Sequence, residues 1–345
     1  MTQTRDSGDD RASARARKPG TATIYDIAEL AGVSPSTVSR ALSKPGRISA
    51  GTEQRIRAAA AELKFRVNPV ARALHTGRHH TIGLVVADIT NPVVFGIVRG
   101  AEHAASAAGY TLVIAESQES GQTEAEAIER LLPSVDGLIL ATTRLADDRI
   151  AELADRKPVV LINRAVSGVD GVLPDVQRGV GELMAHLSGL GHRSLAFVSG
   201  PESSWIGRQR WDRLLEASES LDVAVVEIGP NAPTIEGGHD ALRRVLAARP
   251  SAVVAFNDLI AIGLMQAASA RGMRVPDDLS VAGFDDIFGS ELIVPSLTTV
   301  RSRLVEAGER AVRGILARTD QTPAPDGGLL RTELVVRGST GPAAS

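Results

Sequence analysis

The chain has 345 residues, of which 43% are hydrophobic and 23% are charged, and it contains no cysteine. This length allows two or three domains, and the composition is that of a globular protein. The absence of cysteine excludes disulfides and thiolate metal sites. No apolar run approaches the roughly 20 residues of a membrane span. Residues 1–22 are polar and lack the apolar core of a signal peptide, so we expect a disordered tail on a cytoplasmic protein without a membrane partner.

The net charge of −3 hides an asymmetry along the chain. Residues 1–80 contain 14 Lys and Arg against 7 Asp and Glu, a net charge of +7, and the remainder contains 24 against 34, a net charge of −10. A basic segment attached to an acidic body indicates that the basic segment meets a polyanion. Charge alone leaves a solvated basic tail as the alternative.

Residues 23–66 carry the signals of three short helices. Thr23 opens a capping-box pattern, and Gly32 is placed to end that first helix. Ser34 is a second N-cap, followed by proline at the favoured first helical position, and a third helix follows from Ser49. Two short helices joined by a tight turn and covered by a third predict a helix-turn-helix DNA-binding domain.

The second of these helices is the candidate reading element. Arg40 on its outward side can pair with a guanine edge, which contributes about 1–3 kcal/mol of discrimination. The exposed amides at the helix N-terminus suit phosphates. A small helical bundle with a solvated polar face is the alternative interpretation. We expect Ser36 and Arg40 to read bases, within a set of candidate DNA contacts made of Thr23, Tyr25, Ser34, Pro35, Ser36, Thr37, Ser39 and Arg40.

Residues 67–80 form a linker that contains a predicted hinge helix. Asn68 is its N-cap, a proline follows, and the helix runs about two turns, too short to be stable alone in water. We therefore expect it to fold only when it docks, with the two copies of a dimer packed together and Leu74 wedged into a minor-groove base step. The candidate DNA contacts of this segment are Asn68, Ala71, Arg72 and Leu74.

From residue 81 to residue 345, strand-like apolar runs alternate with helical patterns. Such alternation predicts an α/β body built on parallel sheets with right-handed crossovers. The runs fall into two series, so we expect two lobes that can close on each other by a hinge motion. Ligands of such sheets bind beyond the carboxyl ends of the strands, which places an effector pocket in the cleft between the lobes.

Polar side chains stand at the ends of several predicted strands. Trp205 and Arg208 lie in the loop that follows a further predicted strand, SLAFVS. An arginine fork and carboxylates can bridge vicinal hydroxyls, and an aromatic ring can cover an apolar sugar face. An alternative for Asn257 and Asp285 is that they cap the helices that follow them. The candidate effector contacts are Asp88, Asn91, Phe95, Arg164, Trp205, Arg208, Asn257 and Asp285.

Together, TIYDIAELAGVSPSTVSRALSKPGRIS and the later NPVARALHTG resemble the head and hinge helix of the lactose-repressor family of bacterial transcription factors. The resemblance continues to Thr340 through IGLVVADITNP, LGHRSLAFVSGP, AFND, VAGFDDI and ELVVRGST. It implies a periplasmic-binding-protein-like body whose chain crosses between lobes near 165–175, 290–298 and 325–332. It further implies a homodimer that binds a partly palindromic operator and responds to a small molecule.

The same resemblance implies that Arg208, Asn257 and Asp285 hold the hydroxyls of a sugar or nucleoside-like effector. Val93 stands where family members often offer an aromatic ring to the ligand, and the whole chain has ten aromatic residues. A pyranose sugar is therefore a weaker expectation than a carbohydrate-like effector in general.

Enzyme functions find little support in the sequence. It has no G-x-x-x-x-G-K-[ST] loop, no G-x-G-x-x-G after a strand, no H-E-x-x-H and no cysteine nucleophile. We expect no catalytic residues, no cofactor and no metal site; His75, His79 and His80 fit a polar linker better than a metal site. A solute-binding receptor with the same body is the other alternative, which would need export in place of a DNA-binding head.

Overall fold

A computed structural model describes residues 22–43, 47–65, 77–323 and 327–343. The chain divides into two compact units, residues 1–77 and residues 78–345, and this boundary falls inside the predicted linker. The predicted tail up to residue 21 lies outside the described residues. So does the predicted hinge helix, with its four candidate DNA contacts Asn68, Ala71, Arg72 and Leu74.

The first unit contains helices α1 (Ile24–Ala31), α2 (Pro35–Ser43) and α3 (Ala50–Glu62). The capping box at Thr23 forms as predicted, because its backbone N–H donates to Asp26 Oδ2 at 2.7 Å and its side chain accepts from the Asp26 N–H. Gly32 adopts the left-handed conformation that ends α1. The hydroxyls of Ser34 and Ser49 accept from the amides three residues later, which fixes the starts of α2 and α3.

A small hydrophobic core holds these three helices together. Ile27 of α1, Val38 of α2 and Ile56 of α3 are fully buried and belong to one cluster. Each comes from the apolar side of its helix. The packing of Val38 therefore leaves the opposite, polar side of α2 facing solvent. The helix-turn-helix domain expected from the caps is thus formed, with Arg40 exposed.

The first lobe of the second unit is a five-stranded parallel sheet in the order β2-β1-β3-β4-β5. Its strands are β1 (Thr81–Val86), β2 (Thr111–Glu116), β3 (Gly137–Ala141), β4 (Val159–Ile162) and β5 (Asp170–Val172). Its helices are α5 (Val93–Ala107), α6 (Gly121–Leu131), the short 3-10 helix η1 (Leu132–Ser134), α7 (Asp147–Arg156) and α12 (Leu304–Asp320).

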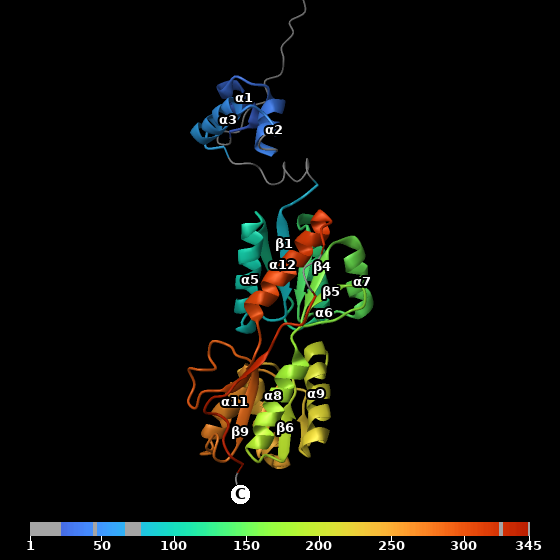
Figure 1. Cartoon of the computed structure of the whole chain (residues 1–345), viewed down its shortest axis with the longest axis vertical. Helices are drawn as coiled ribbons and strands as arrows, with labels where there is room; N and C mark the ends of the chain where they lie inside the picture. The colour runs from blue at the N-terminus through green and yellow to red at the C-terminus, as the bar shows by residue number, and fades with distance from the viewer. Residues whose placement is uncertain (1–21, 44–46, 66–76, 324–326, 344–345) are drawn as a thin grey trace, which may run out of the picture. The chain divides into compact units, whose positions relative to one another are not determined.

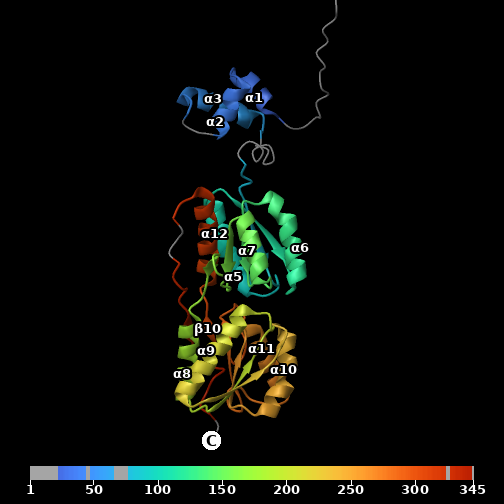
Figure 2. The same ribbon diagram turned by 90° about the vertical axis from the view of Figure 1, so that its right-hand side faces the viewer.

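Side chains of this sheet alternate between two separate clusters, as strand geometry requires. Ile82 and Leu84 of β1 pack with α5 and α12, whereas Val85 packs with α6 and α7. The two helix pairs therefore cover opposite faces, an arrangement that can be followed in Figure 2. Strands buried on both faces explain the continuous apolar runs read from the sequence.

The second lobe is a six-stranded sheet in the order β11-β10-β9-β8-β6-β7, parallel except for β11. Helices α8 and α9 cover one face and α10 and α11 cover the other (Figure 2). Its strands are β6 (Ser194–Val198), β7 (Ala224–Ile228), β8 (Ala252–Ala255), β9 (Ser280–Asp285), β10 (Thr298–Arg301) and β11 (Glu333–Val335). Its helices are α8 (Val176–Gly189), α9 (Trp205–Leu221), α10 (Ile235–Ala248) and α11 (Asp258–Ser269).

The chain crosses between the lobes three times, as Figure 1 shows. The first crossing follows β5 and the third follows α12, and they join where Asp175 N–H donates to the carbonyl of Leu330 at 2.8 Å. The second crossing was expected at 290–298, and this prediction is wrong. That segment leads into β10 of the second sheet, and the chain crosses at 302–303 instead, between β10 and α12.

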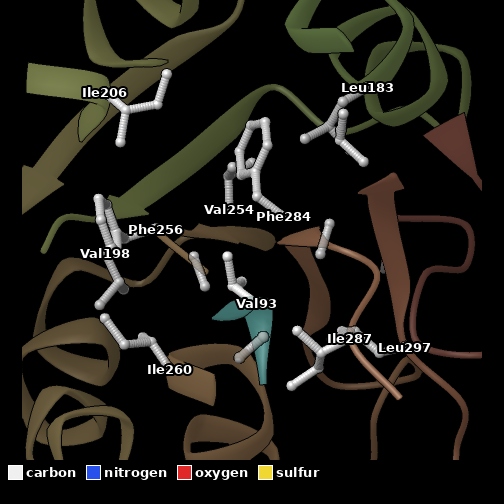
Figure 3. Close-up of a cluster of buried hydrophobic side chains, with 14 of the residues drawn as sticks. Val93, Leu183, Val198, Ile206, Val254, Phe256, Ile260, Phe284, Ile287 and Leu297 are labelled. Carbon is white, nitrogen blue, oxygen red and sulfur yellow. The ribbon is translucent and has the colours of Figure 1, made fainter. Parts of the chain in front are cut away.

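Val93 connects the two lobes by packing. It is the first residue of α5, is 8% exposed, and belongs to the same buried cluster as Phe256 and Phe284 of the second lobe. Figure 3 shows this cluster around Val93. The aliphatic side chain that replaces the expected aromatic ring therefore takes part in apolar contact between the lobes.

Helices α5 and α12 lie side by side on the first lobe (Figure 1), with their backbones almost in contact. A Cβ on Gly308 of α12 would lie 2.1 Å from the carbonyl oxygen of Ile97 in α5, and one on Gly100 would lie 1.9 Å from the carbonyl oxygen of Val305. These contacts are with backbone atoms, which cannot rotate away. The two helices are therefore closely packed at this point.

Gly308→Ala is expected to lower the free energy of unfolding by about 1–3 kcal/mol through this overlap. Urea denaturation followed by circular dichroism measures it. Gly181→Ala in α8 is the matched control, because its Cβ would have no neighbour within 4 Å. That variant should be neutral or gain roughly 1 kcal/mol from helix propensity. Equal losses in both variants would contradict the close packing of α5 on α12.

Candidate functional site

A cavity of about 50 Å³ lies between the two lobes, with room for a few water molecules. Residues that follow the strands line it: Asp88 after β1, Thr142 after β3 and Asn163 after β4 in the first lobe. Asn257 after β8 and Asp285 at the end of β9 face them from the second lobe. The cavity therefore occupies the place expected from the carboxyl ends of parallel strands.

Four residues that line the cavity have a left-handed backbone. The φ angles are 59° at Glu119, 58° at Thr142, 60° at Asn163 and 104° at Asp285. This conformation is unfavourable for a β-branched residue such as threonine, and it persists only where the surroundings enforce it. Such residues gather at ligand sites, so the backbone makes this cavity the candidate functional site.

Arg210 is a buried cation in the cavity wall. It projects from α9, is 4% exposed, and its Nη2 lies 2.9 Å from Asp285 Oδ1. Its Nη1 donates to the carbonyl of Phe256, and the guanidinium carbon lies 4.3 Å from the centroid of the Phe284 ring. The charge is thus satisfied by a carboxylate, a carbonyl and a ring face within the second lobe.

A second arginine–carboxylate pair lines the cavity from the first lobe. Arg144 Nη2 lies 2.6 Å from Glu119 Oε2, and its Nε donates to the same oxygen at 2.8 Å. Its Nη1 donates to the carbonyl of Thr142 at 2.9 Å. Each lobe therefore presents one guanidinium held in place by its own carboxylate.

Four of the eight sequence-predicted effector residues line the cavity: Asp88, Asn91, Asn257 and Asp285. Asn257 also caps α11, because its Oδ1 accepts from the Ile260 N–H at 2.9 Å and its amide donates to the Pro233 carbonyl. The capping role considered for Asn257 is therefore confirmed, and it coexists with a place in the cavity wall. Asp88 accepts from the amide and hydroxyl of Thr90, which shapes the loop after β1.

The other four predicted effector residues lie outside the cavity lining, and their assignment is corrected. Phe95 is 57% exposed on α5. Arg164 points away, to Asp147 at 2.5 Å. Trp205 packs against the hydrophobic core from the first turn of α9. Arg208 is exposed and donates to the carbonyl of Glu202 at 2.8 Å.

The sequence interpretation placed the cavity arginine two residues too early. Positions two apart on an α-helix point about 200° away from each other. The buried side of α9 carries Ile206, Arg210 and Leu214, a four-residue spacing that leaves Arg208 outside. An arginine within an apolar stripe is the signal that identifies Arg210. Asn163 had the same strand-end signal as Asp88, whereas Arg144 and Glu119 had no comparable sequence signal.

On the helix-turn-helix domain, the predicted reading residues are accessible. Ser36 and Arg40 are exposed and lie four positions apart, on one side of α2. Tyr25 of α1 is 66% exposed. The Ser34 hydroxyl lies 2.9 Å from that of Ser36 and 2.8 Å from that of Thr37, so these three form a hydroxyl cluster at the start of α2.

Two kinds of feature are missing from the part of the chain that the structure describes. Within residues 22–43, 47–65, 77–323 and 327–343, no group of three or more His, Asp or Glu side chains is placed to hold a metal ion. In the same ranges, no helix is both long and apolar enough to cross a bilayer. His79 and His80 belong to these ranges, whereas His75 does not.

Comparison with known proteins connects both units to one class. Residues 23–68 match the family described as bacterial regulatory proteins, lacI family, and residues 184–340 match a periplasmic binding protein-like domain. The chain is 34% identical to the HTH-type transcriptional regulator DegA of Bacillus subtilis over 93% of this chain and 98% of that protein. It is 32% identical to the ribose operon repressor of Halalkalibacterium halodurans over 92% and 97% of the two chains.

Among solved structures, the lac repressor dimer bound to operator and the anti-inducer ONPF superposes with a TM-score of 0.83. That match has 27% identity and covers 93% of this chain and all of the other. A helix-turn-helix head joined to a two-lobed body with an interlobe cavity defines a ligand-responsive transcriptional regulator. The chain belongs to the lacI family of bacterial regulatory proteins.

Proposed function

We propose that this chain binds a partly palindromic operator as a homodimer and represses transcription, and that a small molecule in the interlobe cavity switches its DNA affinity. The observation that carries the proposal is the cavity itself, walled by both lobes and by one guanidinium–carboxylate pair from each. A ligand there contacts both lobes, so its differential affinity can shift the balance between lobe arrangements. The structural relative described above is a dimer bound to operator, which supports this assignment.

The effector that best suits the lining is a neutral polyhydroxylated molecule such as a sugar or nucleoside, which the cavity of about 50 Å³ admits only when the lobes move apart. Both guanidiniums already have carboxylate partners, and the lining holds a third carboxylate, Asp88. A phosphate group would therefore meet a lining with net negative charge. Hydroxyls can accept from the arginines and donate to the carboxylates without that cost. One relative of this chain is named a ribose operon repressor, in line with this choice.

DNA reading is assigned to α2, with Ser36 and Arg40 as base contacts. Arg40→Ala is expected to weaken binding to the preferred duplex by about 1–3 kcal/mol and to relax the preference at one base pair per half-site. Selection of duplexes from a random pool with wild-type and variant proteins measures both effects. A uniform loss of affinity with unchanged sequence preference would instead make Arg40 a phosphate contact.

Cytoplasmic location and the absence of catalysis belong to the same proposal. The relatives compared above are named as regulators or repressors, and a DNA ligand requires access to the chromosome. The cavity residues have roles in binding without a nucleophile paired to a base, which supports a binding protein over an enzyme.

The test combines a ligand screen with DNA binding. Thermal-shift measurements on the full chain compare neutral sugars and nucleosides with their phosphate esters, and any hit is added to the duplex selected by the wild-type protein. The expected result is a neutral hit that changes DNA affinity. A phosphate ester as the only hit would overturn the effector class, and failure to select any sequence would overturn the function.

A further inference from the structure

The second unit begins with three residues that are tied tightly to the first lobe. The backbone amides of His79 and His80 donate to Asp136 Oδ1 and Oδ2, each at 2.7 Å. Asp136 precedes β3 and is 6% exposed. One buried carboxylate that accepts from two successive amides fixes the direction of the chain as it enters β1.

Arg78, the residue before them, is tied to the end of α12. Its Nη1 lies 2.7 Å from Asp320 Oδ1, and its Nη2 donates to the carbonyl of Thr319 at 2.8 Å. The last carbonyls of a helix have no partner within it and carry the negative end of the helix dipole, so a guanidinium there is favourable. We call the contacts of Arg78 with Thr319 and Asp320 the linker anchor.

The opposite end of α12 lies at a crossing between the lobes. α12 begins at Leu304, directly after the 302–303 crossing from the second sheet. Near its start, at Val305 and Gly308, it packs backbone to backbone on α5, and α5 begins at the cavity wall with Val93 and Val94. Helix α12, packed on α5 beside the interlobe cavity, therefore extends from the crossing between the lobes to the linker anchor.

We propose that Asp320 is a positioning residue for DNA binding: through Arg78 it sets the direction in which the linker leaves the body, and so converts lobe movement into a change of operator affinity. This inference rests on the proposed function. The Arg78 and Asp320 side chains are 41% and 48% exposed, so their ion pair contributes little to folding. The positioning role separates from a structural one because DNA affinity should change while stability does not.

The test uses full-length protein and a duplex that the wild-type chain selects from a random pool, with fluorescence anisotropy at fixed salt. Asp320→Asn is expected to weaken binding by about fivefold or more, the lower range of typical coupling effects. The direction of the change in DNA affinity distinguishes a positioning role from a phosphate contact. If Arg78 served only to contact phosphate, removal of a neighbouring negative charge would leave binding unchanged or strengthen it. Either of those results overturns the inference.

Asp170→Asn is the matched control. It removes one negative charge and one ion pair with α12, because Arg318 Nε lies 2.6 Å from Asp170 Oδ2, with side-chain exposures of 43% and 36%. This variant should bind the duplex as the wild type does, and both variants should melt like the wild type. An equal loss of DNA affinity in the control would show that the effect follows from net charge. It would contradict the proposed role of the linker anchor.

A charge exchange covers the case in which Asp320→Asn melts early. The double variant Arg78→Asp with Asp320→Arg rebuilds the ion pair in reverse, and it should bind the duplex more tightly than Arg78→Asp with Asp170→Arg, which has the same net charge. No recovery would overturn the inference. Failure of the proposed function gives a different result, because the wild-type chain would then select no duplex at all.

Discussion

Arg210→Ala is expected to lower the free energy of unfolding by about 3–5 kcal/mol, the usual effect of removing one partner of a buried ion pair. The loss leaves Asp285, which is 8% exposed, as a buried carboxylate without its cation. It also removes the donor to the Phe256 carbonyl. Chemical denaturation followed by circular dichroism measures the change.

Arg208→Ala is the control for this prediction. Arg208 lies two residues earlier on the same helix, but it is exposed and bonds only the nearby Glu202 carbonyl among the hydrogen bonds described for it. Its loss should change stability by no more than about 0.5 kcal/mol. The two variants should also differ in the thermal shift given by an effector, which only Arg210→Ala should abolish. Similar behaviour of both variants would contradict the assignment of the cavity to Arg210.

Local signals in the sequence predicted the three helices of the first unit and the parallel sheets of the second. Caps at Thr23, Ser34 and Ser49 placed three helices, because a hydroxyl or carboxylate three residues from an amide specifies a helix start locally. Apolar runs such as those of β1 and β3 gave the parallel sheets, because strands covered on both faces need no polar alternation. These features depend on neighbours in sequence, which a single chain displays directly.

The features that the sequence did not predict depend on contacts between residues far apart in the chain. The short strands β5 and β11 gain their identity from pairing with β4 and β10, so three residues alone carry no signal. The pairing of Arg210 with Asp285 joins positions 75 residues apart. The choice between Arg208 and Arg210 depends on helical phase, which a resemblance in sequence motifs does not reveal.

The role of Asp258 was not predicted by any sequence motif. It is the first residue of α11 and is fully buried, yet three donors reach its carboxylate. Oδ2 accepts from the Ile287 amide at 2.9 Å and the Ser290 hydroxyl at 2.6 Å, and Oδ1 accepts from the Thr299 hydroxyl at 2.6 Å. These bonds tie the loop after β9, and with it the backbone beside Asp285, to α11 and β10.

Burial, reinforced by the nearby charge of Asp285, raises the pKa of Asp258 from 3.8 to about 7. Between these two values the folded protein holds a proton that the unfolded chain has released, so the stability contributed by Asp258 falls as pH rises from about 4 to about 7. The full difference corresponds to at most about 4 kcal/mol. The wild-type protein should therefore lose stability between pH 5 and pH 8 through this group.

Asp258→Asn should remove that loss. The asparagine carbonyl can accept from Ile287 and Ser290, and its amide can donate to the Thr299 hydroxyl, which rotates to receive it. Burial lowers the pKa of His186 and His192, so these groups act in the opposite direction, and they act equally in both proteins. The quantity to measure is thus the difference in unfolding free energy between wild type and variant at pH 5 and at pH 8. The variant should gain relative to the wild type at pH 8, and a difference that is the same at both pH values would show that Asp258 does not titrate in this range.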